Sequence, residues 1–341
     1  MEDDRLAESG KLYDDPLLAA YLAAVAARLT PPDASAAGSR RIQVSVWRDP
    51  AVCAFALPSG HVYVSTGLLA RLGNEAQLAA VLGREIAHVT GGHAVVSGAA
   101  RAGGRPSAPL GPGLPLASAA AVGGFDGRLE READQAAMER MVRAGYDPRE
   151  AAQAFRLLRE DPVDPGKLEP CLLGTRAALD ERARAIDELW RSRYAGLDTA
   201  GLVTNTEEFR RRVRVVVRDN AALDLRAGRF EVARIQLDRA LAVAPDDPVT
   251  HLYYGDLYRL ESQRAAGAEE RTELLARART AYERSAALDP TYADPFRQLG
   301  LLYYQSADNT QARQAFATYL TLRPDAPDAR RVKEYMTELG H

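Results

Sequence analysis

The C-terminal part of the chain repeats itself, and this repetition limits its fold more than any other feature. The recurring positions are Gly255 and Gly300, Tyr258 and Tyr303, and Leu237 and Tyr282, each 45 apart, and Tyr282 and Phe316, and Pro290 and Pro324, each 34 apart. The longer interval contains an 11-residue insertion at about 262–273. One such unit cannot bury its apolar face alone, so successive units must stack. We therefore expect an all-α solenoid over residues 201–341.

The repeat unit has a small residue in its first helix, an aromatic residue in its second and a closing proline. This is the tetratricopeptide pattern. Three repeats end at Pro245, Pro290 and Pro324, and residues 328–339 form a capping helix. Stacked helix pairs of this kind present a concave surface. We expect a protein or peptide partner to bind through residues 205–341.

A second feature is one helical turn, residues 83–88, inside the apolar run 75–89. With histidine at position 84 this turn would read H-E-x-x-H, in which two imidazoles four residues apart reach one metal from the same helix face. The glutamate between them then acts as general base on the metal-bound water. Arg84 occupies the first ligand position, and a guanidinium has no lone pair for a metal.

The residues before the repeats predict a mixed α+β domain over 1–200. Period-two alternation predicts strands at 41–47 and 61–65, joined by a turn-containing connector at 54–60. Helices are expected at 14–29, 66–72, 74–89, 128–144, 147–159 and 179–194. The stretch 101–124 is rich in glycine and proline, so it is a flexible insertion or a lid rather than a regular element.

Composition excludes some functions. The net charge of -3 gives no reason to expect binding to nucleic acid or to a membrane surface. No apolar run is long enough to span a bilayer, and the acidic opening residues 1–6 lack the apolar region of a signal peptide. The protein is therefore cytoplasmic, or an export signal has been removed. Two cysteines, Cys53 and Cys171, are too few for a disulfide framework, so we expect two buried free thiols.

Four stretches of the first 195 residues resemble the zinc metallopeptidases of peptidase family M48, the HtpX-like and BepA-like enzymes. The stretches are A-F-A-L-P-S-G-H-V-Y-V-S-T-G-L-L at 54–69, the helix from Glu75 to His93, E-R-E-A-D at 130–134 and A-G-Y-D-P at 144–148. Their order and spacing make the resemblance specific. It implies an α+β metallopeptidase-like domain of the gluzincin type, followed here by an all-α tetratricopeptide-repeat solenoid.

The resemblance also implies roles for individual residues. His88 would be the second zinc ligand, Glu130 the third ligand and Glu85 the general base. Asp134 would orient a ligand from outside the metal shell. Arg84 stands where the first ligand belongs.

A second departure from the family lies at 174–177, where the family often has T-H-P and this chain has Arg176 in place of the histidine. Three residues could supply a substitute ligand: His61, His93 and Cys53. Without a metal, Glu85 and Glu130 would face each other in a partly buried cleft, which is costly for carboxylates. We expect Arg84 to supply the missing positive charge by pairing with one of them.

These features predict an inactive metallopeptidase-like protein, a pseudopeptidase, which acts as a protein- or peptide-binding scaffold and holds no metal cofactor. An extended segment could add along the strand His61-Val62-Tyr63-Val64. One alternative is an active zinc endopeptidase with a substitute ligand, and another is an adaptor that works through the repeats alone. By family analogy the protein would be periplasmic or attached to the bacterial envelope.

Overall fold

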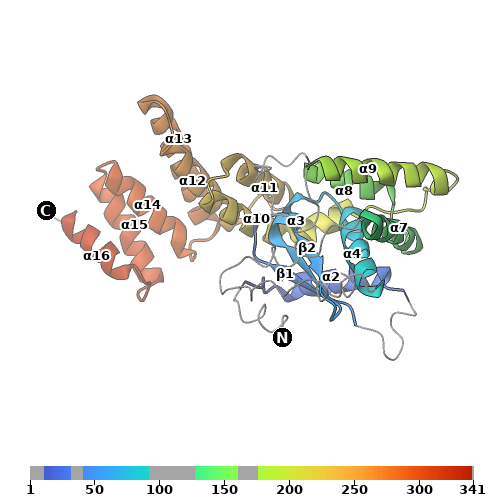
Figure 1. Ribbon diagram of the computed structural model, residues 1–341. Coiled ribbons are helices and arrows are strands. Elements are labelled where there is room, and N and C mark those ends of the chain that lie inside the picture. The colour runs from blue at the N-terminus through green and yellow to red at the C-terminus, as the bar shows by residue number, and fades with distance from the viewer. Residues whose placement is uncertain (1–10, 32–40, 92–126, 160–175, 340–341) are drawn as a thin grey trace, which may run out of the picture. The chain divides into compact units, whose positions relative to one another are not determined.

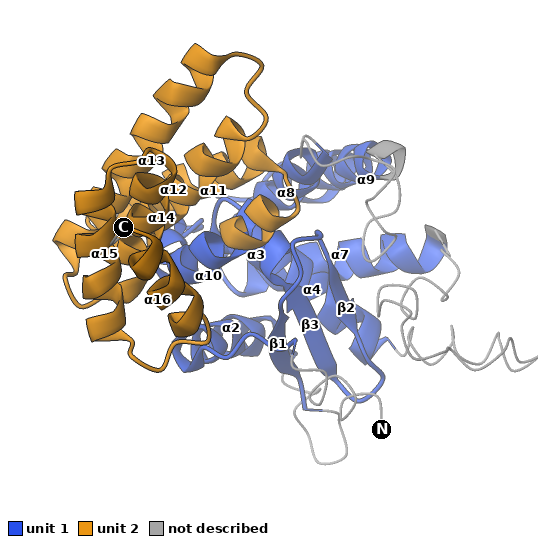
Figure 2. Cartoon of the chain, turned by 90° about the vertical axis from the view of Figure 1, so that its left-hand side faces the viewer, with its two compact units in different colours: residues 1–220 blue, residues 221–341 orange. Residues whose placement is uncertain are grey.

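The computed structural model describes residues 11–31, 41–91, 127–159 and 176–339. The chain forms two compact units, residues 1–220 and 221–341 (Figure 2). The boundary between them falls inside helix α10 (Thr206–Arg226), later in the chain than the boundary at residue 200 that the repeat pattern suggested. The stretch 101–124, His93 and Cys171 lie outside the described residues.

The first unit contains a three-stranded sheet of β1 (Gln43–Trp47), β2 (Ala54–Ala56) and β3 (His61–Ser65), which is drawn in blue in Figure 1. The strand order is β1-β3-β2 (Figure 2). β3 lies in the middle, parallel to β1 and antiparallel to β2. The prediction that residues 61–64 form an edge for strand addition is therefore wrong, because both sides of β3 are already paired. The stretch 54–60, expected to be a connector, begins with the short strand β2 and continues as the turn to β3.

Strand alternation gives the sheet two different faces. Val46, Ala54, Val62 and Val64 point into the main core of the unit. Trp47, Cys53, Phe55 and Tyr63 form a separate cluster, in which the Phe55 and Tyr63 rings stack with centroids 5.1 Å apart. The helices that follow therefore pack on the valine face.

Helix α2 (Pro16–Leu29) lies within the predicted range 14–29. The Asp15 carboxylate accepts hydrogen bonds from the backbone N–H groups of Leu17 and Leu18, both at 3.0 Å, and Pro16 opens the helix. The other helices of this unit are α3 (Thr66–Arg71), α4 (Glu75–Thr90), α7 (Gly127–Arg143), α8 (Arg149–Arg159), α9 (Arg176–Leu189), the π-helical turn η2 (Trp190–Tyr194) and the first part of α10.

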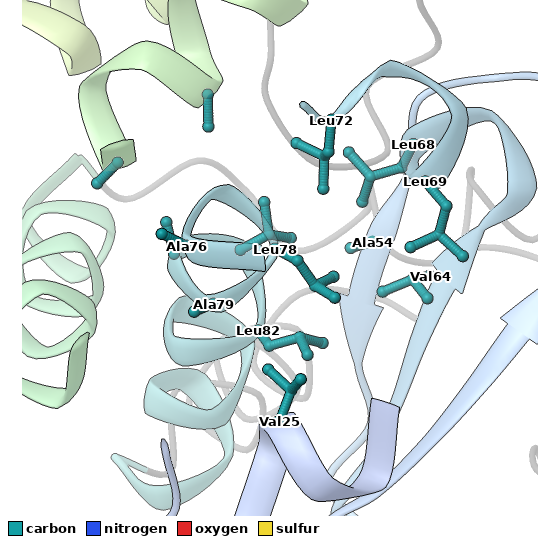
Figure 3. Packing of buried hydrophobic residues seen from close by; sticks show 14 of the residues in the cluster. Val25, Ala54, Val64, Leu68, Leu69, Leu72, Ala76, Leu78, Ala79 and Leu82 are labelled. Carbon is teal, nitrogen blue, oxygen red and sulfur yellow. The ribbon is translucent and has the colours of Figure 1, made fainter. Parts of the chain in front are cut away.

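Helix α4 is the centre of the first unit and is buried on almost every side. Figure 3 shows its leucines, Leu78 and Leu82, gathered with Leu68 and Leu69 of α3 and Val64 of β3. Each fully buried leucine contributes about 1.5–3 kcal/mol through burial. This packing holds the helix that carries the candidate site in one position.

The first residue of α4, Glu75, is a buried carboxylate that joins four segments. It accepts hydrogen bonds from Tyr21 Oη at 2.6 Å, Tyr146 Oη at 2.7 Å and Asn205 Nδ2 at 2.8 Å, and from Arg28. Burial alone would raise the pKa of Glu75, but these donors outweigh it and lower the pKa. The start of α4 is thereby fixed against α2, the turn after α7 and the start of α10.

The first half of α10 belongs to the core of the first unit. Phe209, Val213, Val216 and Val217 are buried there, and Thr66 Oγ1 donates to Asn220 Oδ1 at 2.7 Å. These contacts explain why the unit extends to residue 220: the helix that opens the first repeat completes the hydrophobic core in front of it.

The second unit contains α11 (Phe230–Val243), α12 (Pro248–Ser262), α13 (Ala268–Leu288), α14 (Ala293–Gln305), α15 (Asn309–Leu322) and α16 (Ala329–Glu338). The helical repeats are confirmed, and α11, α13 and α15 each end shortly before one of the three closing prolines. The insertion lengthens α13, which has 21 residues against 14 in α11 and in α15.

The recurring glycines of the repeats mark helix contacts. A Cβ added at Gly255 would overlap the ring of Tyr282, and one added at Gly300 would overlap the ring of Phe316. Both rings are fully buried. The small residue and the aromatic residue therefore recur in register because one packs directly on the other.

Candidate functional site

The candidate site lies where α4 and α7 pack closely together. A Cβ added at Gly83 would lie 3.4 Å from Cα of Ala137, at ordinary van der Waals distance, so the two helix backbones lie close at this point. Arg84, Glu85 and His88 come from α4, and Glu130 and Asp134 come from the first two turns of α7.

Arg84 is the centre of this group. Its Nη1 donates to Glu85 Oε1 and its Nη2 donates to Glu130 Oε2, while its Nε lies 3.8 Å from Asp134 Oδ1. Only 6% of Arg84 is exposed. The expected contact with Glu130 or Glu85 is therefore confirmed, and it involves both carboxylates at once.

His88 and Glu130, the residues that the family resemblance assigns to the metal, remain neighbours. His88 Nε2 lies 3.7 Å from Glu130 Oε1, whereas Arg84 donates to the other oxygen, Oε2. Glu130 thus has a guanidinium next to one carboxylate oxygen and an imidazole next to the other.

Arg182 of α9 is a site residue that the sequence reasoning missed. Its Nε donates to Asp134 Oδ2 at 3.0 Å and its Nη2 donates to Asp134 Oδ1 at 2.5 Å, so the pair is bidentate. Its guanidinium also lies over the ring of Phe155, 4.2 Å from the centroid. Asp134 was expected to orient a metal ligand, and here it binds this arginine.

A pattern in the sequence could have revealed Arg182. Leu179, Ala183 and Ile186 follow helical spacing and are all buried, and Arg182 shares their face. An arginine in the apolar stripe of a helix is almost never buried without a partner. Its position therefore predicts a buried carboxylate opposite, which is Asp134.

Burial and neighbouring charges shift the pKa values of Glu85 and Glu130 in opposite directions. Burial raises the pKa of Glu85 to about 7, against the opposing effect of Arg84. For Glu130, burial also acts upward, but Arg84, His88 and Arg182 together hold its pKa below the usual value. Glu130 is therefore the ionised partner of Arg84, and Glu85 takes up a proton near neutral pH.

The side chains present do not fit a zinc ion in this arrangement. Within the described ranges, no group of three or more His, Cys, Asp or Glu side chains is placed to hold a metal. Arg84 contacts both Glu130 and Glu85, and its guanidinium offers no lone pair.

The substitute ligands have other partners or lie outside the described residues. His61 Nε2 is 2.8 Å from Ser45 Oγ, and the His61 ring stacks on Tyr63. Cys53 takes part in a disulfide bond, so the expectation of two free thiols is wrong and this residue has no thiolate to offer. His93 lies outside the described residues. Arg176, at the position where the family often has a histidine, is the first residue of α9, and its side chain is not described.

Comparison with known proteins gives two family matches. The model of Peptidase family M48 matches residues 16–108, a range that includes Arg84, Glu85 and His88. The front unit is similar to peptidase family M48. A tetratricopeptide-repeat model matches residues 266–337, which is most of the second compact unit, residues 221–341. No curated protein matches the chain.

The M48 match ends before α7, so the assignment of Glu130 and Asp134 rests on the E-R-E-A-D motif and on their contacts with α4. The chain thus combines an M48 peptidase-like domain with repeats of a kind that suits binding of other proteins. None of the helices in its described part is both long and apolar enough to cross a membrane.

Proposed function

We propose that this protein is a pseudopeptidase: an M48-like domain of the gluzincin type that binds protein segments without cutting them, and that holds no resident metal. The observation that carries this proposal is Arg84, which binds both Glu85 and Glu130 from the first ligand position. A metallopeptidase needs an open metal position and a free general base. In this chain a guanidinium contacts both the base and the third ligand.

The charges of the site also support a state without metal. A zinc ion would bring two positive charges next to Glu85 and Glu130, and removing it would leave two carboxylates facing each other. Arg84 supplies a positive charge at that point and bonds to both. Losing one protein ligand of three also weakens metal affinity by orders of magnitude.

The sheet offers an edge for an extended segment at β2, in place of the strand first expected. Leu57 N donates to His61 O and Ser65 N donates to Cys53 O, so residues 53 and 57 pair toward β3. Because pairing alternates along an antiparallel strand, the backbone groups of Ala54 and Ala56 point away from β3. A bound segment would hydrogen-bond to these two residues.

The test combines metal analysis with proteolysis. The purified full chain is dialysed against zinc, analysed for bound metal and incubated with an unfolded protein substrate. We expect far less than one zinc per chain, and no cleavage above that of the Glu85→Gln variant. About one tightly held zinc per chain, with cleavage that disappears in Glu85→Gln, would refute the proposal.

A second candidate function is an active zinc endopeptidase that completes its ligand set with another residue. The observation in its favour is that His88 and Glu130 remain 3.7 Å apart on adjoining helices, with Glu85 beside them. Such an enzyme would have to displace Arg84 from both glutamates, so zinc binding would have to release Arg84 into solvent. The zinc analysis described above also decides this alternative.

We further propose that the protein works in an oxidising compartment such as the bacterial periplasm. Cys53 takes part in a disulfide bond, and stable disulfides form mainly in exported proteins. Thiol counting on protein purified without reductant tests this: we expect none to react, whereas two reactive thiols in the folded protein would contradict it.

A further inference from the structure

Four charged side chains of the site close into a ring in which the charges alternate. Arg84 Nη2 donates to Glu130 Oε2, and Arg182 Nη2 donates to Asp134 Oδ1. The other two sides are longer: Arg84 Nε lies 3.8 Å from that same Asp134 oxygen, and Arg182 Nη1 lies 4.0 Å from that same Glu130 oxygen. Each cation therefore faces both carboxylates, and each carboxylate faces both cations.

The ring is buried, and its two long sides leave unused donors. Arg84 and Arg182 are each 6% exposed. Among the described residues, Arg84 Nε and Arg182 Nη1 have no hydrogen-bond partner. These are the two nitrogens that face the carboxylate oxygens across the long sides. A buried donor without a partner costs free energy. The attraction between the two guanidinium groups and the two carboxylates must therefore offset this cost to keep both arginines in place.

The ring joins three helices. Arg84 comes from α4, Glu130 and Asp134 come from α7, and Arg182 comes from α9. In a metallopeptidase-like domain with a metal, the ion itself would join the first two of these helices. Here guanidinium groups make that link, and Arg182 extends it to a third helix.

We propose that Arg84, Glu130, Arg182 and Asp134 act as one coupled unit that sets the positions of α4, α7 and α9 without a metal, and that Arg182 is its second resident cation. Arg182 is a positioning residue: it acts on Arg84 and on the rest of the candidate site through Asp134 and Glu130. This inference concerns the architecture of the site and holds whether or not the front unit binds a peptide. Its alternative is two independent ion pairs that happen to be close.

Arg182 cannot be exchanged for another cation. It makes two parallel bonds to Asp134 and lies over Phe155, and both contacts need the planar guanidinium. Lysine keeps the charge but can place only one ammonium group. The Arg182→Lys variant should therefore lose most of what Arg182→Met loses.

A double-mutant cycle across a long side of the ring distinguishes the coupled unit from two independent pairs. Arg84→Met, Asp134→Asn and the double variant are made in the full chain, and the folding equilibrium constant of each is measured by denaturant titration. Arg84 and Asp134 share no hydrogen bond, so independent pairs predict additive effects. The ring predicts a favourable interaction between Arg84 and Asp134, so the two losses are not additive. The double variant should have a folding equilibrium constant about tenfold larger than the two single variants together predict.

The matched control is Arg159→Met combined with Asp134→Asn. Arg159 also makes an ion pair between helices of this unit, with Asp180 at 2.8 Å, but both partners are about 40% exposed. We expect this cycle to be additive. In the Arg84 and Asp134 cycle, a folding equilibrium constant of the double variant within twofold of the additive value would overturn the proposal.

A measurement on the unaltered protein covers the case in which the variants do not fold. In a coupled unit, the guanidinium N–H protons of Arg84 and Arg182 are exposed by the same opening event, so NMR should show that they exchange with water at one common slow rate. The protons of Arg159 should exchange far faster. If Arg182 exchanges as fast as Arg159, it is not part of a buried ring and the proposal fails.

Discussion

The stability of the front unit should depend on pH through Glu85. Burial raises the pKa of this carboxyl from 4.5 to about 7 in the folded protein, so the folded state binds the proton more tightly than the unfolded state. The resulting stabilisation is fully present below about pH 4.5 and is lost as the pH rises through about 7. The difference of about 2.5 between the two pKa values corresponds to about 3 kcal/mol in the free energy of unfolding.

The Glu85→Gln variant isolates this effect. An amide stays neutral at every pH, and its oxygen can still accept the hydrogen bond from Arg84. Relative to the wild type, the variant should therefore gain stability between pH 5 and pH 8. For a unit of this size, ~3 kcal/mol corresponds to a relative change of roughly 6–12 °C in melting temperature.

Thermal melts followed by circular dichroism at pH 5, 6, 7 and 8 measure the difference, with Glu181→Gln as the control because Glu181 is an exposed carboxyl on α9. We expect no pH-dependent difference for that control. Glu130 works in the opposite direction: its lowered pKa adds stability that is lost as the pH falls below about 4.5, outside the range of the test. A difference between Glu85→Gln and wild type that stays constant from pH 5 to pH 8 would refute the reasoning.

Three further predictions concern the buried cation, the domain boundary and the repeats. Arg84→Ala should destabilise the front unit by about 3–5 kcal/mol because it leaves buried carboxylates without a positive partner. In the same denaturant titrations, Arg159→Ala at an exposed pair should cost at most ~1 kcal/mol. Equal losses for the two variants would contradict this prediction. A chain ending at residue 200 should fail to fold, as judged by circular dichroism and proteolysis, whereas one ending at 226 should fold because it keeps Phe209 and the buried valines of α10; a stable 1–200 chain would show that α10 is dispensable. Gly255→Ala should lower the melting temperature of the repeats, because its Cβ overlaps the buried Tyr282 ring, whereas Gly267→Ala, where an added Cβ meets no atom within 4 Å, should change it little.

The sequence alone predicts the parts of this fold that depend on local pattern. The helix over residues 16–29, the apolar run of α4 and the repeat register are all local features, and the structure has them within the expected ranges. The contact between Arg84 and the two glutamates followed from the charges and from the family's motifs. The first three features lie within one helix or one repeat, whereas the contact of Arg84 with Glu130 joins two helices and was expected from the family's motifs.

The errors share a different cause, since each depends on contacts between distant segments. Alternation along residues 61–65 shows that they form a strand, but it does not show which strands lie on either side, so β3 was mistaken for an edge. The division of the compact units at residue 220 depends in the same way on distant contacts, because the buried face of α10 packs into the core of the first unit. Arg182 was missed because none of the quoted motifs includes it, although its place on the buried face of α9 carries the signal.

The position of α10 also fixes an order of events during synthesis. The ribosome releases the chain from its N-terminus, and the first unit lacks Phe209, Val213, Val216 and Val217 until α10 emerges. Until then, the core cluster to which these four residues belong is incomplete. The first unit therefore closes only when the helix that opens the repeat array has been made. The later repeats then grow from a helix that is already held in place at its N-terminal half.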